Sequence, residues 1–163
     1  MKKLLFLFLS FLFFFCNAET LKAGIEESYI PAGFYGSWGV ISKLNNCTNP
    51  DIFNYESRDI WVLSGYGNVL ILENIESGAR SEITIKEKAA DGKTLKFERQ
   101  KTVNTQDNKI IYRETVTFVL SGNNFSGSDR FVIEKYTLQG ILLKKDSASY
   151  RVEGVKIAGE NPK

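Results

Sequence analysis

The chain has 163 residues, of which 43% are hydrophobic and 25% are charged, a composition typical of a folded globular protein. It contains no histidine, so the commonest general base and the commonest metal ligand are both missing. Once the two lysines of the first three residues are set aside, 19 basic residues balance 19 acidic ones. From this balance we expect no binding of nucleic acid and no electrostatic attraction to anionic lipid.

The first 18 residues have the pattern of a secretory signal peptide. Lys2 and Lys3 precede an apolar run from Leu4 to Phe15, and the small residue Ala18 follows. The run is shorter than the roughly 20 residues that span a bilayer, so we expect no transmembrane segment in the mature chain. The pattern predicts cleavage after Ala18 and a secreted or periplasmic protein. An alternative is cleavage before Cys16 and lipid attachment to that cysteine, as in bacterial lipoproteins.

The rest of the chain is expected to form one domain with short extensions. Residues 19–33 have no clear period and are predicted to be an N-terminal arm, with a helical turn near 25–29. Residues 34–157 form the domain and 158–163 a C-terminal tail. β-Branched and aromatic residues in short blocks or in alternation predict eight strands in the domain. They are expected at 34–43, 59–64, 68–74, 82–88, 94–103, 110–120, 125–136 and 149–157, with 138–144 extending the seventh or forming an extra one.

Turn-forming sequences separate these strands, and their spacing leaves room for one strand but no crossover helix. Sequential strands should therefore pair antiparallel as a meander. Alternation such as Leu95 and Phe97 against Lys96 and Glu98 gives each strand one apolar face. No amphipathic helix is available to cover that face. The sequence therefore predicts an all-β fold, an up-and-down antiparallel barrel of about eight strands.

The segment Phe34-Tyr35-Gly36-Ser37-Trp38 resembles the first-strand signature of the lipocalins, a family of calycin-type β-barrels. The resemblance implies that Trp38 closes the barrel floor, that Gly36 allows a sharp backbone turn beside it, and that Arg151 lies across the indole ring. It also implies a large first loop over the barrel mouth, expected at 44–57.

A barrel of this size can be filled by its own side chains or can hold one small ligand. The leading hypothesis is a secreted or periplasmic lipocalin-like protein that binds a small hydrophobic molecule inside the barrel. Glu114 shares the apolar side of its strand, so it is expected either to hold a polar ligand group, with Arg99 or Lys135, or to form an internal ion pair. The predicted ligand-contacting residues are Trp38, Trp61, Ile85, Phe97, Tyr112, Glu114, Phe118 and Phe131.

The alternative hypothesis is a protein-interaction module, an envelope assembly factor or an enzyme inhibitor, with a solid barrel and recognition through its loops. A catalytic barrel is a weaker third possibility, because no nucleophile elbow, phosphate loop or metal-spaced cluster occurs. We therefore expect no enzyme activity, no cofactor and no metal. Cys47, the remaining cysteine of the cleaved chain, is expected to be either a small half-buried residue or a free or intermolecularly paired thiol.

Overall fold

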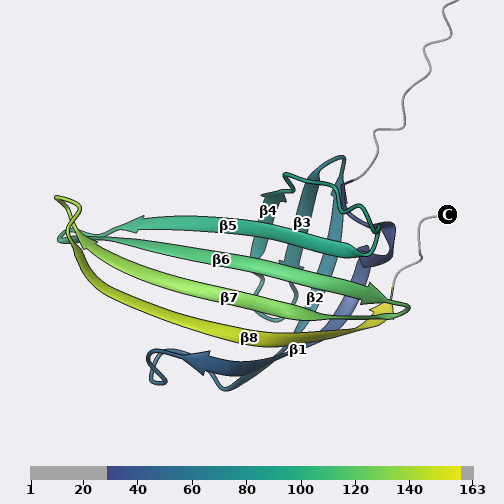
Figure 1. The fold of residues 1–163 in the computed structure, drawn as a ribbon, viewed down its shortest axis with the longest axis horizontal. Coiled ribbons are helices and arrows are strands. Elements are labelled where there is room, and N and C mark those ends of the chain that lie inside the picture. Colours follow the sequence, from purple (N-terminus) through teal and green to yellow (C-terminus); the bar gives the residue numbers. More distant parts are fainter. Residues whose placement is uncertain (1–28, 159–163) are drawn as a thin grey trace, which may run out of the picture.

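The structure, a computed structural model, describes residues 29–158 and is all-β (Figure 1). The predicted signal peptide, Cys16 and most of the predicted N-terminal arm lie outside the described residues. The sheet has eight antiparallel strands in the order β4-β3-β2-β1-β8-β7-β6-β5. Their bounds are β1 Gly36–Cys47, β2 Glu56–Tyr66, β3 Val69–Asn74, β4 Arg80–Thr84, β5 Thr94–Asn104, β6 Asn108–Ser121, β7 Asn124–Thr137 and β8 Leu142–Ala158.

The strands form a meander that curls until its two edges approach each other. Every neighbouring pair from β4 through β1 and β8 to β5 is joined by an antiparallel ladder. The edges are β4 and β5, and we call the line between them the seam. At the seam, Arg99 of β5 donates a hydrogen bond of 2.9 Å from Nη1 to Oγ of Ser81 on β4. The predicted fold class is confirmed as a nearly closed eight-stranded barrel, which is compatible with a lipocalin-like fold.

Several boundaries differ from the sequence-based prediction. Strand β4 ends at Thr84 rather than Lys88, and β2 begins at Glu56 rather than Asp59. The two largest extensions arise because pairing continues beyond the hydrophobic pattern. Residues 44–47 continue β1, since Leu44 pairs with Tyr150 and Cys47 with Ala148. The connection that was expected to be a long loop at 44–57 is therefore the shorter segment 48–55. Strand β8 begins at Leu142 rather than Ser149, because its first residues pair with the end of β7. Segment 138–144 thus supplies the β7–β8 turn and the start of β8.

The barrel is not symmetric along its strands. Strands β5 to β8 are long and extend well past the short strands β3 and β4 (Figure 1). The β5–β6 and β7–β8 turns lie together at the far end of this extension, which we call the arm. Within the described part of the chain, no helix has the length and apolar character needed to cross a membrane.

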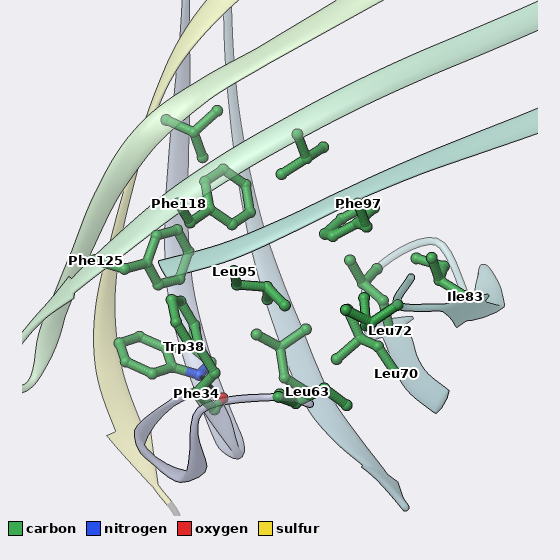
Figure 2. Close-up of a cluster of buried hydrophobic side chains, with 14 of the residues drawn as sticks. Phe34, Trp38, Leu63, Leu70, Leu72, Ile83, Leu95, Phe97, Phe118 and Phe125 are labelled. Atoms are coloured by element: carbon green, nitrogen blue, oxygen red, sulfur yellow. Dashed lines mark hydrogen bonds between the residues drawn. The ribbon is translucent and has the colours of Figure 1, made fainter. Parts of the chain in front are cut away.

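One end of the barrel is filled by a compact aromatic and aliphatic core (Figure 2). Trp38 is fully buried between Phe34 and Phe125, and its Nε1 donates a hydrogen bond of 2.7 Å to the Phe34 carbonyl. Phe34 ends the 3₁₀ turn Ala32–Phe34, and Gly36 then begins β1 with a φ of 121°, a conformation that other residues rarely adopt. The predicted roles of Trp38 as floor and Gly36 as turn residue fit this geometry.

The cation on the floor tryptophan is not the one predicted. Nζ of Lys156 lies 5.4 Å from the centroid of the Trp38 ring and donates a hydrogen bond of 3.1 Å to the Gly33 carbonyl. Arg151 instead has an exposed side chain that pairs with Glu153, its neighbour on the outer side of β8. The prediction for Arg151 was wrong because strand register, which the resemblance did not supply, sets Lys156 opposite Trp38.

Candidate functional site

On every strand, an inward-facing residue just beyond the packed core is polar. On β6, inward Phe118 and Val116 are followed by Glu114, and on β5 inward Phe97 is followed by Arg99. Each of the other six strands also places a polar residue beyond the packed core on the inward side. We call this set the polar layer, and it comprises Ser42, Asp59, Asn74, Ser81, Arg99, Glu114, Asp129 and Tyr150.

An ion pair in the polar layer lies beside the seam. Glu114 is only 8% exposed, and Nε of Arg99 on the adjacent strand donates a hydrogen bond to its Oε2. The same guanidinium reaches across the seam to Ser81. Burial lowers the pKa of Arg99, and the nearby negative charge of Asp129 partly opposes this shift. The pair therefore neutralises the most buried carboxylate of the layer and links the two barrel edges.

Asp129 is the acid of the layer whose charge is least well compensated. Its Oδ1 is buried and accepts no hydrogen bond from any described residue. Burial raises the pKa of Asp129 to about 6, although the positive charge of Arg99 opposes that rise. Tyr150 lies opposite Asp129 on β8, and its pKa is also raised, by burial first and then by the charge of Asp129.

A hollow of about 290 Å³ opens above the polar layer at the mouth of the barrel. Its aromatic lining comes from Trp61, Phe131, Tyr150 and Phe53. Phe53 belongs to the loop between β1 and β2, yet it is 8% exposed and packs edge-on against Phe131 with ring centroids 6.4 Å apart. The predicted first loop thus sends one aromatic side chain into the barrel mouth.

The charged side chains that line this hollow are all acidic, namely Asp59, Glu114 and Asp129. Asp59 accepts a hydrogen bond of 3.0 Å from Nδ2 of Asn74, and Glu114 is paired with Arg99. A site with an aromatic wall and uncompensated negative charge suits a cation or a strong hydrogen-bond donor.

A second hollow of about 620 Å³ runs along the seam toward the arm. Its lining includes Glu114 and Phe131, so it borders the first hollow, and Tyr112 packs against Phe131 with ring centroids 6.3 Å apart. Val103 and Lys101 continue the lining along β5. A molecule bound at the polar layer could therefore extend along this second hollow toward the arm, between apolar residues such as Tyr112 and Val103 and charged ones such as Lys101.

The structure divides the eight residues predicted as ligand contacts into two groups. Trp61, Tyr112, Glu114 and Phe131 line the hollows at the mouth and seam. Trp38, Ile85, Phe97 and Phe118 are at most 4% exposed and belong to the packed core.

Of the two cations predicted as partners of Glu114, Arg99 makes the ion pair, whereas Lys135 lies farther along β7, opposite Lys144. Sequence reasoning missed Asp59, Asp129 and Tyr150 as site residues. Asp59 lies two residues from Trp61, and Asp129 two residues from Phe131, so each shares the inward side of its strand with that aromatic residue. This alternation was the sequence signal that could have identified the two acids as site residues.

The Cys47 thiol is half-buried and forms no disulfide with another described residue. In the described range 29–158, no group of three His, Cys, Asp or Glu side chains is arranged to hold a metal ion. Comparison of the chain with protein-family models, with curated proteins and with solved structures finds no match. The similarity to the lipocalins thus consists of the barrel architecture and the Phe34-x-Gly36-x-Trp38 segment.

Proposed function

We propose that this protein binds a small hydrophobic molecule at the barrel mouth, and that the molecule carries an amine or another strong hydrogen-bond donor. The observation that carries the proposal is the hollow in which four aromatic side chains and three carboxylates face the same space. Binding sites for small molecules commonly combine such an apolar wall with a few polar groups that fix orientation.

The packed core limits where the ligand can lie. Phe118 and Phe125 stack with ring centroids 4.8 Å apart, and Trp61 lies 6.1 Å from Phe118 on the mouth side. The space below Trp61 is thus filled by the protein's own side chains. The apolar part of the ligand would rest against Trp61, Phe131 and Tyr112, above the core rather than deep inside it.

The polar layer supports a positively charged or hydrogen-bond-donating group on the ligand. Asp129 has a buried oxygen that lacks a donor, so a ligand N–H at that position would satisfy it. Glu114 already has Arg99 as its cation, and Asp59 already accepts a hydrogen bond from Asn74. Asp129 is therefore proposed as the main polar contact.

A matched ligand series tests this proposal. Phenylethylamine, phenylethanol and phenylacetate share an aromatic body but carry a cation, a neutral hydroxyl and an anion. We expect calorimetric titration at pH 7.5 to give the tightest binding for the amine and the weakest for the acid. Asp129→Asn should weaken amine binding by about tenfold, the loss of roughly one charge-assisted hydrogen bond. Asp107→Asn, in the exposed β5–β6 turn, is the matched control and should leave binding unchanged.

Two results would contradict the proposal in different ways. Equal binding of all three compounds would mean that the aromatic wall binds ligands while the acids play no part. Failure of all three compounds, and of longer alkyl amines, to bind would remove the small-molecule function itself.

We also propose that the protein is exported and acts by binding rather than by catalysis. Export is supported by the basic, apolar and small-residue order of residues 1–18. A binding role is supported by the absence of histidine and of any recognisable nucleophile motif in the sequence. Fusion of residues 1–18 to a reporter enzyme that is active only after export, followed by N-terminal sequencing of the product, tests the export step.

A further inference from the structure

The turn between β7 and β8 exposes an unusual concentration of large aliphatic side chains. Leu138, Ile141, Leu142 and Leu143 are 48–65% exposed and lie within six residues of one another. They account for four of the 13 exposed large hydrophobic residues of the described chain. A backbone hydrogen bond from Thr137 to the Ile141 carbonyl and one from Gly140 to the Thr137 carbonyl hold the turn in shape. The side chains are thus presented by an ordered hairpin.

Lysines surround this apolar turn. The end of the arm consists of residues 101–109 on β5 and β6 and residues 135–145 on β7 and β8. Together these two stretches contain five lysines and one acidic residue, Asp107. The lysines are Lys101, Lys109, Lys135, Lys144 and Lys145. Although the charge of the whole domain is balanced, this end of the molecule therefore carries a local excess of positive charge.

Two of these lysines also have internal partners. Nζ of Lys144 lies 2.9 Å from Oδ2 of Asp146, and Nζ of Lys145 lies 3.1 Å from Oε1 of Glu134. Both carboxylates are buried, whereas both lysine side chains are more than half exposed. These two carboxylates adjoin the stretches counted above, so five lysines face three acidic residues, Asp107, Glu134 and Asp146, and the end of the arm keeps a net positive charge.

We propose that the end of the arm docks on an anionic membrane surface, with the β7–β8 turn inserted among the lipid headgroups. The turn is a narrow projection at the far end of the long strands, remote from β3 and β4 (Figure 1). This shape fits insertion between lipids, while the lysines behind it are placed to contact negatively charged headgroups. Insertion of the aliphatic side chains and attraction of the lysines to anionic lipid both contribute to the binding free energy. The two contributions add, because both groups lie at the same end of the molecule.

The proposal is independent of the small-molecule site, because the aliphatic residues of the β7–β8 turn that would insert into lipid line neither hollow, although Lys101 borders the hollow along the seam. Docking through the end of the arm would leave the seam and the mouth of the barrel open to solvent. The protein could then exchange its ligand close to a membrane.

Vesicle co-sedimentation of the full chain tests the proposal. The probe vesicles are phosphatidylcholine alone and phosphatidylcholine with 30% phosphatidylglycerol. We expect at least about tenfold stronger partitioning onto the anionic vesicles, weakening as salt rises from about 50 to 500 mM. The double variant Leu138→Ser/Ile141→Ser should lose at least about tenfold of this binding. Both residues are exposed, so the variant should retain the circular dichroism spectrum and melting temperature of the wild type.

The matched control is Ile75→Ser, which alters an exposed isoleucine in the β3–β4 turn and should bind vesicles like the wild type. Equal partitioning onto the two vesicle types, or unchanged binding by the double variant, would overturn the proposal. So would sedimentation as a dimer that the double variant dissociates, since the turn would then be covered by a second copy. Capture of a protein partner in place of lipid would likewise overturn it.

Discussion

Asp129 makes the stability of the barrel depend on pH in a direction opposite to that of most carboxylates. Its pKa is raised to about 6 in the folded protein by burial, against an ordinary value of 3.8. Because the folded-state pKa is the higher one, this group stabilises the fold fully below pH 4, and the contribution is lost as the pH rises through 6. At pH 8 the ionised, buried carboxylate disfavours folding by about 2–3 kcal/mol.

Asp129→Asn should therefore stabilise the protein at pH 8 and have little effect at pH 4. Urea unfolding of wild type and variant at both pH values measures the difference directly, and other titrating acids cancel in the comparison. A variant that is less stable than the wild type at pH 8 would contradict this account of Asp129.

The Arg99–Glu114 pair should be more important for stability than the ion pairs on the barrel surface. Arg99→Gln leaves the buried Glu114 without its cation and removes the link to Ser81. Since the Arg99 side chain is 39% exposed, we expect a loss of about 2–3 kcal/mol, less than for a fully buried pair.

Arg80→Gln provides the control for that loss, because Arg80 and Glu82 form an exposed pair. Denaturant unfolding at pH 7 should give a change below about 1 kcal/mol for this variant. The double variant Arg99→Gln/Glu114→Gln should recover part of the stability lost in Arg99→Gln, because no uncompensated charge remains. Additive losses in the double variant would show that the two side chains act independently.

At the scale of the strands, the seam is the weakest line of the sheet. Strand β4 has five residues and one bonded neighbour, β3, whereas β7 pairs along its whole length with both β6 and β8. Native-state hydrogen exchange should therefore find β4 amides opening at least about 2 kcal/mol more easily than those of β7. Arg99→Gln should speed exchange in β4 selectively, since it removes the Ser81 contact. Uniform protection across β4 and β7 would mean that the barrel opens only as a whole.

The strands themselves could be predicted from the sequence because each has one apolar side, as in Leu95 and Phe97. The polar layer could not be predicted as a unit, because it is composed of one residue from each of eight strands. Alternation places Asp129 on the inward side of β7, but only the register with β8 sets it opposite Tyr150. The same dependence on register explains why Lys156, and not Arg151, covers Trp38. Periodicity is a local property, whereas register depends on pairing with distant strands.

At the scale of the whole molecule, the barrel separates a structural end from a binding end. The structural end is closed by the 3₁₀ turn before β1 and filled with aromatic rings, and the binding end carries the polar layer and the hollows. The arm extends the binding end and brings the apolar β7–β8 turn, with lysines on its flanking strands, to its tip (Figure 1). Folding should thus depend mainly on one end and recognition on the other.

Phe118 and Trp61 test this separation, because their rings are 6.1 Å apart but belong to different ends. Phe118 is 1% exposed, so Phe118→Ala should cost about 3–5 kcal/mol by leaving a cavity in the core. Trp61 is half-buried and lines the mouth, so Trp61→Ala should cost clearly less stability while weakening phenylethylamine binding by about tenfold or more. Unfolding and binding measured on the same two variants at pH 7.5 give the comparison. If Trp61→Ala destabilised the fold as much as Phe118→Ala and left binding intact, the mouth would be an extension of the core, and the division of the barrel into two ends would be wrong.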